Sequence, residues 1–232
     1  MNKIINGFKD VIKGSYGLFI YLFIQIGTGL VFANQLKSGS YNLVNVILIG
    51  SEILTAVLLI ILNWKRLKKD FIDFDHNYKK YLAIGFKAWI IGIMVMIISN
   101  AIINGYIFSD VANNEAIDRA VINYYPLYSV IAMIFIGPFI EELTFRCGYK
   151  DHIKNKKLYY ILTVLIFAGA HVINGITTPL ELLYFIPYGA LAVAFSYTLD
   201  KTDNIFTTTI IHTFHNTLSI LILIAGMMFG AI

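Results

Sequence analysis

Long runs of apolar residues dominate this chain and restrict it to folds that satisfy their own backbone hydrogen bonds. About 20 apolar residues cross the hydrocarbon core of a bilayer as one helix. Inside lipid, only α-helices and closed barrels leave no backbone group unpaired. We expect an all-α polytopic transmembrane helix bundle with longer loops at Trp64–Lys80 and Phe108–Tyr124. About seven spans are predicted, at roughly 15–34, 42–63, 81–105, 126–149, 158–174, 179–199 and 205–230.

The composition also identifies lipid as the solvent. Of the 232 residues, 58% are hydrophobic and only 14% are charged, and the mean hydropathy is +0.71. A soluble domain carries about 25% charged residues. We expect the formal net charge of +4 to come from cytoplasmic loops. The positive charge therefore does not indicate nucleic-acid binding, and the expected partner is the lipid bilayer. The single cysteine, Cys147, excludes an intrachain disulfide and any Cys-rich metal site.

Lysine and arginine gather in alternate loops and predict the orientation of the chain. They cluster before the first span, after the second and after the fourth, whereas 35–41, 106–125 and 174–178 hold at most one each. Because cytoplasmic loops carry the basic excess, we expect a multi-pass protein of the cell membrane with a cytoplasmic N-terminus and an extracytoplasmic C-terminus. Val31-Phe32-Ala33 resembles a signal-peptide cleavage site, but six further spans favour an uncleaved signal anchor.

Three charged residues interrupt the span at 126–149, namely Glu141, Glu142 and Arg146. A charge at bilayer depth costs about 2.5–3.5 kcal/mol on insertion scales and usually marks a working site. Glu142 and Arg146 are four residues apart on one helix face, and we interpret them as a structural salt bridge. Glu141 points about 100° away and is less able to reach Arg146. We interpret Glu141 as a cavity-facing carboxylate that acts as a general base.

Two further polar clusters lie in later spans. His171 follows three small residues, which let another helix approach closely, and Phe167 lies one turn earlier on the same face. Taken alone, His171 is equally well explained as an interhelical hydrogen bonder or as a functional residue. In the seventh span, His212 and Asn216 share a face, with His215 about 60° round from His212. His212 and Asn216 can each donate a hydrogen bond to an oxyanion. Hydrogen bonding between helices is an alternative explanation for any one of the three residues, and a weaker one for all three together.

The depths of these residues test whether one cavity can hold them all. Counted from the cytoplasmic ends at 1.5 Å per residue, Glu141 lies about 12–14 Å deep, His212 about 10 Å and His171 about 20 Å. The first two depths agree, whereas His171 is deeper. We therefore expect the fifth helix to be tilted or to begin later than residue 158, around a cavity reached from the cytoplasmic side.

Taken together, the three motifs resemble the CPBP family, the CAAX-protease and bacteriocin-processing membrane proteins that are also called the ABI family. The motifs are Glu-Glu-x-x-x-Arg, Phe-x-x-x-His and His-x-x-x-Asn, in this order on successive hydrophobic helices, and the resemblance covers about Leu127 to the C-terminus. It implies a CPBP-type catalytic core in 126–232, after N-terminal helices and loops in 1–125 with about three spans, all within one integral membrane unit. The family often has glycine directly after the arginine. Here Cys147 occupies that position and Gly148 follows it, and we expect this difference to have little effect on the motif.

The resemblance implies an intramembrane endopeptidase that hydrolyses a bond in a membrane-associated peptide or protein. In the family, the positions that match Glu141 and His171 activate water. The positions that match His212 and Asn216 stabilise the oxyanion. The roles it suggests are processing of a peptide pheromone or bacteriocin, or self-immunity to one. The supporting motif residues are Glu142, Arg146 and Phe167.

Proteins of this family are often labelled metalloproteases, so zinc is an alternative. The chain has no His-Glu-x-x-His motif. Glu141, His171 and His212 (or His215) could hold zinc with one open position. That arrangement would consume the only candidate base, so we expect no cofactor and keep zinc as the alternative.

Two other classes of function use the same buried charges. One is a non-proteolytic scaffold that regulates a partner such as a sensor kinase. The other is a small transporter, against which the chain shows no inverted repeat and no matched pair of broken helices. Elsewhere in lipid, Glu52 and Lys87 lie on consecutive antiparallel spans, and we expect them to pair, although Lys87 alone could snorkel to the interface.

Overall fold

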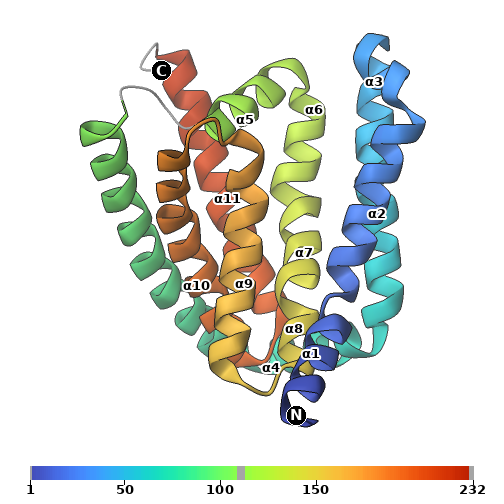
Figure 1. The fold of residues 1–232 in the computed structure, drawn as a ribbon, viewed down its shortest axis with the longest axis vertical. Helices are drawn as coiled ribbons and strands as arrows, with labels where there is room; N and C mark the ends of the chain where they lie inside the picture. The colour runs from blue at the N-terminus through green and yellow to red at the C-terminus, as the bar shows by residue number, and fades with distance from the viewer. Residues whose placement is uncertain (1, 109–112, 230–232) are drawn as a thin grey trace.

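The computed structural model describes residues 2–108 and 113–229, and within these residues every regular element is a helix. Five helices are long and apolar enough to cross a membrane, and a sixth if the bent pair Ile5–Gly14 and Tyr16–Val31 counts as one span. The predicted all-α polytopic bundle is therefore the observed fold (Figure 1).

Its helices are α1 (Asn2–Gly14), α2 (Tyr16–Val31), α3 (Ala33–Ser38), α4 (Tyr41–Tyr106), α5 (Asn113–Tyr124), α6 (Pro126–Ser129), α7 (Gly137–Glu142), α8 (Gly148–His152), α9 (Lys156–Val172), α10 (Phe185–Thr202) and α11 (Ile205–Met228). Two π-helical segments, η1 (Val130–Ile136) and η2 (Leu143–Cys147), and two 3₁₀ turns, η3 (Ile173–Gly175) and η4 (Pro179–Tyr184), complete them.

Helix α4 contains two of the predicted spans in one continuous element of 66 residues. At 1.5 Å per residue it is about 99 Å long, far more than the roughly 30 Å of a bilayer core. It runs down one side of the bundle, turns beneath it and rises on the other side (Figure 1). The predicted loop at Trp64–Lys80 is therefore wrong. No glycine or proline lies between Gly50 and Gly85, so nothing in this stretch stops the helix.

The predicted loop at Phe108–Tyr124 is also wrong over most of its length. Its second half forms α5, and residues 109–112 lie outside the described residues. The predicted seventh span ends two residues beyond Met228, where α11 ends, and residue 230 is likewise outside the described residues. The first span corresponds to α2 and is joined to α1 with a bend of 48°.

The segment from Pro126 to His152 is long and apolar enough to be one span, but two π-helical segments, η1 and η2, interrupt its α-helix. Its first π-helical segment ends where Gly137 donates its backbone N–H to the carbonyl of Ala132, five residues earlier. The next residue, Pro138, has no N–H to donate. In this register the carbonyl of Met133 would accept the hydrogen bond from residue 138, so Pro138 leaves it without that donor. Short π-helical insertions are frequent at functional sites.

Helix α11 is anchored at its first residue to α4. The backbone N–H of Ile205 donates to the Asp70 carboxylate at 2.9 Å. The Asn204 side chain accepts from the backbone N–H of Thr207 and donates to the carbonyl of Asp70. An Asn cap at this point satisfies N–H groups that no helix can satisfy itself. These bonds set the height at which α11 enters the bundle.

Basic and acidic side chains join several elements at one end of the bundle, which we call the basic end. Arg66 contacts Asp70, Asp151 and Asp203 at 2.9, 2.7 and 2.8 Å. Lys150 and Lys156 both contact Asp200, at 2.7 and 2.9 Å. The segments that carry the basic clusters of the sequence, most of them helical, therefore meet at one end. Helix α1 lies at this end, and α11 ends at the other (Figure 1).

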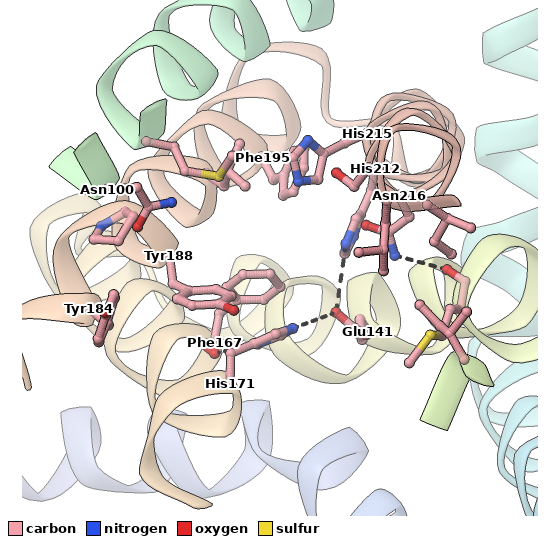
Figure 2. A pocket seen from close by; sticks show the side chains of 18 residues that line it. Asn100, Glu141, Phe167, His171, Tyr184, Tyr188, Phe195, His212, His215 and Asn216 are labelled. Carbon is pink, nitrogen blue, oxygen red and sulfur yellow. Dashed lines mark hydrogen bonds and ion pairs between the residues drawn. The ribbon is translucent and has the colours of Figure 1, made fainter. Parts of the chain in front are cut away.

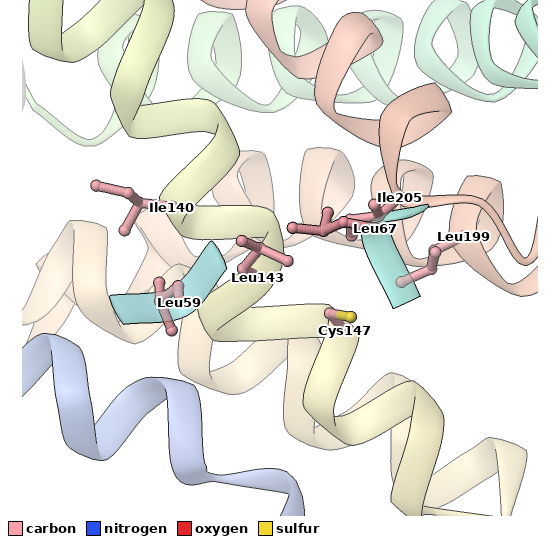
Figure 3. Packing of buried hydrophobic residues seen from close by; sticks show 7 residues of the cluster. All are labelled: Leu59, Leu67, Ile140, Leu143, Cys147, Leu199 and Ile205. Carbon is pink, nitrogen blue, oxygen red and sulfur yellow. The ribbon is translucent and has the colours of Figure 1, made fainter. Parts of the chain in front are cut away.

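A buried apolar cluster packs α7 and η2 between α4 and the last two helices (Figure 3). This packing fixes the glutamate-bearing turn within the bundle. Many other large apolar side chains are exposed, as expected where lipid replaces water. The cluster consists of Leu59, Leu67, Ile140, Leu143, Cys147, Leu199 and Ile205.

Candidate active site

Glu142 and Arg146 form the predicted ion pair, with both side chains 0% exposed. Nη1 of Arg146 donates to Oε1 of Glu142 at 2.6 Å. The Arg146 guanidinium also lies over the rings of Phe167 and Phe195, at 4.4 and 5.2 Å from their centroids. Nε and Nη2 of Arg146 have no hydrogen-bond acceptor, so the aromatic faces take the place of polar partners. The pair makes two charges tolerable in lipid.

The same carboxylate of Glu142 also holds a histidine from α11. Nδ1 of His212 lies 2.7 Å from Oε1 of Glu142. An ionised carboxylate only accepts hydrogen bonds, so Nδ1 of His212 carries a proton and its Nε2 is directed elsewhere. Phe195 stacks on the His212 ring at 4.5 Å and 24°. Glu142 is thus the link between the ion pair and the third motif.

His171 is oriented in the same way from α9. Its Nδ1 lies 2.8 Å from the carbonyl oxygen of Phe167, and a carbonyl can only accept. The ring of Phe167 lies tilted against the His171 ring at 4.3 Å between centroids, and Tyr188 stacks on the His171 ring at 5.2 Å. The Phe-x-x-x-His spacing therefore supplies both the acceptor and the packing surface that fix the His171 ring.

The carboxylate of Glu141 lies close to both His171 and His212. Oε2 of Glu141 lies 3.8 Å from Nε2 of His171 and 3.7 Å from Nε2 of His212 (Figure 2). These distances are longer than direct hydrogen bonds, and at such a spacing a single water can bridge two polar groups. The Glu141 side chain is 22% exposed, in contrast to Glu142. Three helices thus place a carboxylate and two imidazoles around one point.

Asn216 is held by the carbonyl that Pro138 leaves free. Its Nδ2 donates to the carbonyl oxygen of Met133 at 2.9 Å (Figure 2). A side-chain amide has two N–H groups, so one remains for another acceptor. The break in the backbone ladder before Glu141 therefore positions a residue on a different helix.

These residues line a cavity of about 500 Å³ within the bundle. Glu141, His171, His212 and Asn216 all contribute to its wall. A volume of this size matches the range of small-ligand sites, about 300–1,000 Å³. Most of the remaining wall is apolar, with side chains such as Met96, Met133, Leu191 and Leu223.

All seven residues selected from the sequence are brought together, but one other expectation is wrong and half of a second is excluded. Helix α9 begins at Lys156, because Asn155 caps it by accepting from the N–H of Leu158. A start later than residue 158 is therefore excluded, and the tilt of this helix stays a prediction. The pair of Glu52 and Lys87 is absent. Glu52 accepts from Gln25 of α2 at 3.2 Å, and Lys87 is exposed. The two limbs of α4 lie on opposite sides of the bundle (Figure 1), which keeps these residues apart.

Several residues at the site could not be found from the sequence. Phe195, Tyr188 and Trp89 lie in stretches rich in apolar and aromatic residues, so no local pattern distinguishes them. Only helix packing places them against His212, His171 and His215.

A metal site requires several donor atoms around one position. Among residues 2–108 and 113–229, no group of three or more His, Cys, Asp or Glu side chains has an arrangement that could hold a metal ion. The Nε2 atoms of His171 and His212 lie 3.8 and 3.7 Å from the same oxygen of Glu141. The described residues therefore do not fit zinc, and we derive no step through it.

Comparison with known proteins identifies one family. Residues 123–218 match the family model described as type II CAAX prenyl endopeptidase Rce1-like. The match includes all three motifs, from Glu141 to Asn216. No curated protein and no solved structure matches the chain.

Proposed function

Because residues 123–218 form an Rce1-like domain of the CPBP family, we propose that this protein is an intramembrane endopeptidase that acts on a membrane-associated peptide or protein. The observation that supports this most is the convergence of His171 and His212 on the carboxylate of Glu141. Glutamate can act as a general acid or base. A carboxylate at membrane depth costs free energy, so its presence usually marks a functional site.

In the proposed reaction, Glu141 is the general base. It takes one proton from a water molecule that also donates a hydrogen bond to Nε2 of His171. The resulting hydroxide forms a bond to the scissile carbonyl carbon. Nε2 of His171 can accept because Nδ1 already carries the proton that faces Phe167. Glu141 then gives its proton to the amide nitrogen, the C–N bond breaks, and an acid and an amine leave.

His212 and Asn216 stabilise the oxyanion in this proposal. Since Nδ1 of His212 donates to Glu142, its Nε2 can donate only when the ring is a doubly protonated imidazolium. The charges of Glu141, Glu142, Arg146 and the His212 imidazolium then sum to zero in the buried site. Asn216 offers its second amide hydrogen. One such donor is typically worth about 2.7–4 kcal/mol.

We propose further that the protein lies in the cell membrane with the basic end in the cytoplasm, since the basic residues of α4 and α8 gather there. The N-terminus is then cytoplasmic and the C-terminus extracytoplasmic. Processing of a peptide pheromone or bacteriocin, self-immunity, and cleavage of a prenylated CAAX peptide are the candidate tasks that the family suggests.

We propose a reaction without metal. Purified active protein is expected to contain no stoichiometric zinc and to keep its activity after dialysis against a chelator. Stoichiometric zinc that leaves together with activity, and restores it when added back, would replace this mechanism with the zinc-dependent one.

Comparative peptide profiling of membranes tests the proposed function. Cells that express wild-type protein, the Glu141→Gln variant or a Glu52→Gln control are compared by mass spectrometry. Glu52 is a second buried intramembrane glutamate that does not line the cavity. We expect one or more uncleaved peptides to accumulate with Glu141→Gln alone. If a cellular phenotype of the protein survives Glu141→Gln and His212→Ala, the scaffold alternative is correct.

A further inference from the structure

His215 is a buried polar residue in the cavity wall for which the proposed reaction has no use. It is the neighbour of Asn216 and lies three residues after His212. With Ser219, these residues occupy positions i, i+3, i+4 and i+7 of α11, which form one helix face, and all four line the cavity. The cavity therefore has a polar stripe that extends past the catalytic motif.

Trp89 fixes the protonation pattern of His215. Nε1 of Trp89, on the second limb of α4, donates to Nδ1 of His215 at 3.3 Å. An indole N–H can only donate, so Nδ1 of His215 must offer a lone pair. The ring is then neutral, and its single proton lies on Nε2. Phe214 and Phe86 hold the indole in place by edge contacts at 5.1 and 6.3 Å.

At Nδ1, this protonation pattern is the opposite of that of the other two histidines at the site. His171 and His212 donate from Nδ1 to fixed acceptors, whereas His215 accepts at Nδ1 and can donate only from Nε2. Among the residues that the structure describes, His215 has one hydrogen bond, the one from Trp89 to its Nδ1, and its Nε2 is not one of the buried atoms that lack a partner. Nε2 is therefore open to the cavity that His215 lines. The cavity thus contains an N–H group that is available to a ligand.

We propose that His215 is a substrate-positioning residue whose Nε2–H donates a hydrogen bond to a backbone carbonyl of the peptide in the cavity, with its tautomer fixed by Trp89. A peptide carbonyl is the acceptor that an apolar substrate brings to any site. The surrounding wall of Met96, Leu191 and Ile220 suits apolar side chains. This inference rests on the proposed function and adds α4, outside the matched domain, to substrate recognition.

Nitrogen NMR tests the tautomer without requiring any hydrolysis. Protein with ¹⁵N-labelled histidine, in detergent micelles, is compared as wild type, His215→Gln for assignment, and Trp89→Phe. We expect His215 to show a protonated Nε2 and a bare Nδ1 in wild type, and a mixture of tautomers in Trp89→Phe. A protonated Nδ1 in wild type would overturn the proposal.

The second test uses a probe of stated chemistry, an acetylated tetrapeptide amide of leucine and isoleucine, added to the Glu141→Gln variant. We expect a saturable shift of the His215 Nε2 signal that is absent for His76, an exposed histidine at the basic end. No shift at millimolar probe would overturn the proposal. Because Glu141→Gln cannot hydrolyse the probe under the proposed function, this readout is independent of whether hydrolysis exists.

Kinetics then separate positioning from catalysis, with a peptide that accumulates in Glu141→Gln membranes as the substrate. We expect His215→Phe to raise KM about tenfold with kcat nearly unchanged, which is the loss of one hydrogen bond made equally in the ground and transition states. His215→Gln, which keeps an N–H donor, should recover most of the affinity, and Trp89→Phe should have an intermediate effect. An unchanged KM, or an effect confined to kcat, would overturn the proposal. If no peptide accumulates, the proposed function fails while the NMR results still decide this inference.

Discussion

Nδ1 of His212 and Nη1 of Arg146 share one acceptor, Oε1 of Glu142, at 2.7 and 2.6 Å. A residue that the sequence indicates as half of a structural salt bridge therefore also orients a proposed oxyanion donor. This arrangement makes Glu142 a positioning residue, because it acts on the reaction only through His212.

Breaking the Glu142 ion pair should destabilise the fold strongly. Glu142→Leu leaves the buried guanidinium of Arg146 without a counter-charge, and loss of one partner of a buried pair costs about 3–5 kcal/mol. The double variant Glu142→Leu with Arg146→Met should lose much less, because it leaves no unpaired charge. Denaturant unfolding in micelles measures both. A double variant as unstable as the sum of the singles would contradict this account.

Removing His212 should slow the chemical step more than it weakens binding. We expect His212→Ala to lower kcat by about 10²–10³, the usual loss for one oxyanion donor, with little change in KM. His76→Ala is the matched control, because His76 is exposed and contacts only a backbone carbonyl in its own helix. A rise in KM at constant kcat would place His212 in substrate binding instead.

Pro138 should control the position of Asn216. In Pro138→Ala a new backbone N–H can donate to the carbonyl of Met133 and compete with the Asn216 amide. We expect kcat to fall by up to about 10², the value for loss of one donor, while the helix itself becomes more regular. Pro126→Ala, at the start of α6 where a missing N–H has no consequence, should retain full activity. Equal effects of the two changes would argue against this link.

Acid should weaken the basic end through Asp203. Burial alone would raise the pKa of Asp203, but the hydrogen bonds and charge of Arg66, helped by Lys69, hold this pKa below its usual value. A lowered pKa means that the stabilisation is complete above about pH 5 and is lost as the pH falls through the folded-state pKa. Asp203 has φ 48°, a conformation that Asn also tolerates.

Thermal unfolding of wild type and Asp203→Asn between pH 7 and pH 3 measures this effect. We expect the variant to be less stable than wild type at pH 7 and the difference to shrink towards pH 3. The Asp203 side chain is 53% exposed, so the difference in stability between wild type and variant should be small at every pH. A gap that widens in acid would contradict the direction of the pKa shift.

The sequence predicts the parts of this molecule that depend on local periodicity. Hydropathy identifies the spans, and the spacing of four residues identifies the pair of Glu142 and Arg146, because a single helix determines both. The shared role of Glu142 could not be predicted, since His212 reaches it from 70 residues away. The continuous α4 was missed because a charged segment resembles a loop by hydropathy, although it lacks any residue that would end a helix.

The contacts of the aromatic residues with the histidines could not be predicted from the sequence either. Phe195 and Trp89 contact His212 and His215 only after α10 and α4 have packed against α11. An aromatic residue in a lipid-facing helix carries no signal of such a contact, because the same residue type is equally suited to lipid.

The rate of peptide hydrolysis by purified protein in lipid vesicles tests the central claim most directly. A peptide that accumulates in Glu141→Gln membranes is offered to wild type, Glu141→Gln and Glu52→Gln under single-turnover conditions. Both variants replace an intramembrane carboxylate with an amide of the same shape, but only Glu141 lies beside His171 and His212. We predict cleavage by wild type and Glu52→Gln, and none by Glu141→Gln even though it folds and binds the peptide. Cleavage by Glu141→Gln at the wild-type rate would contradict the account.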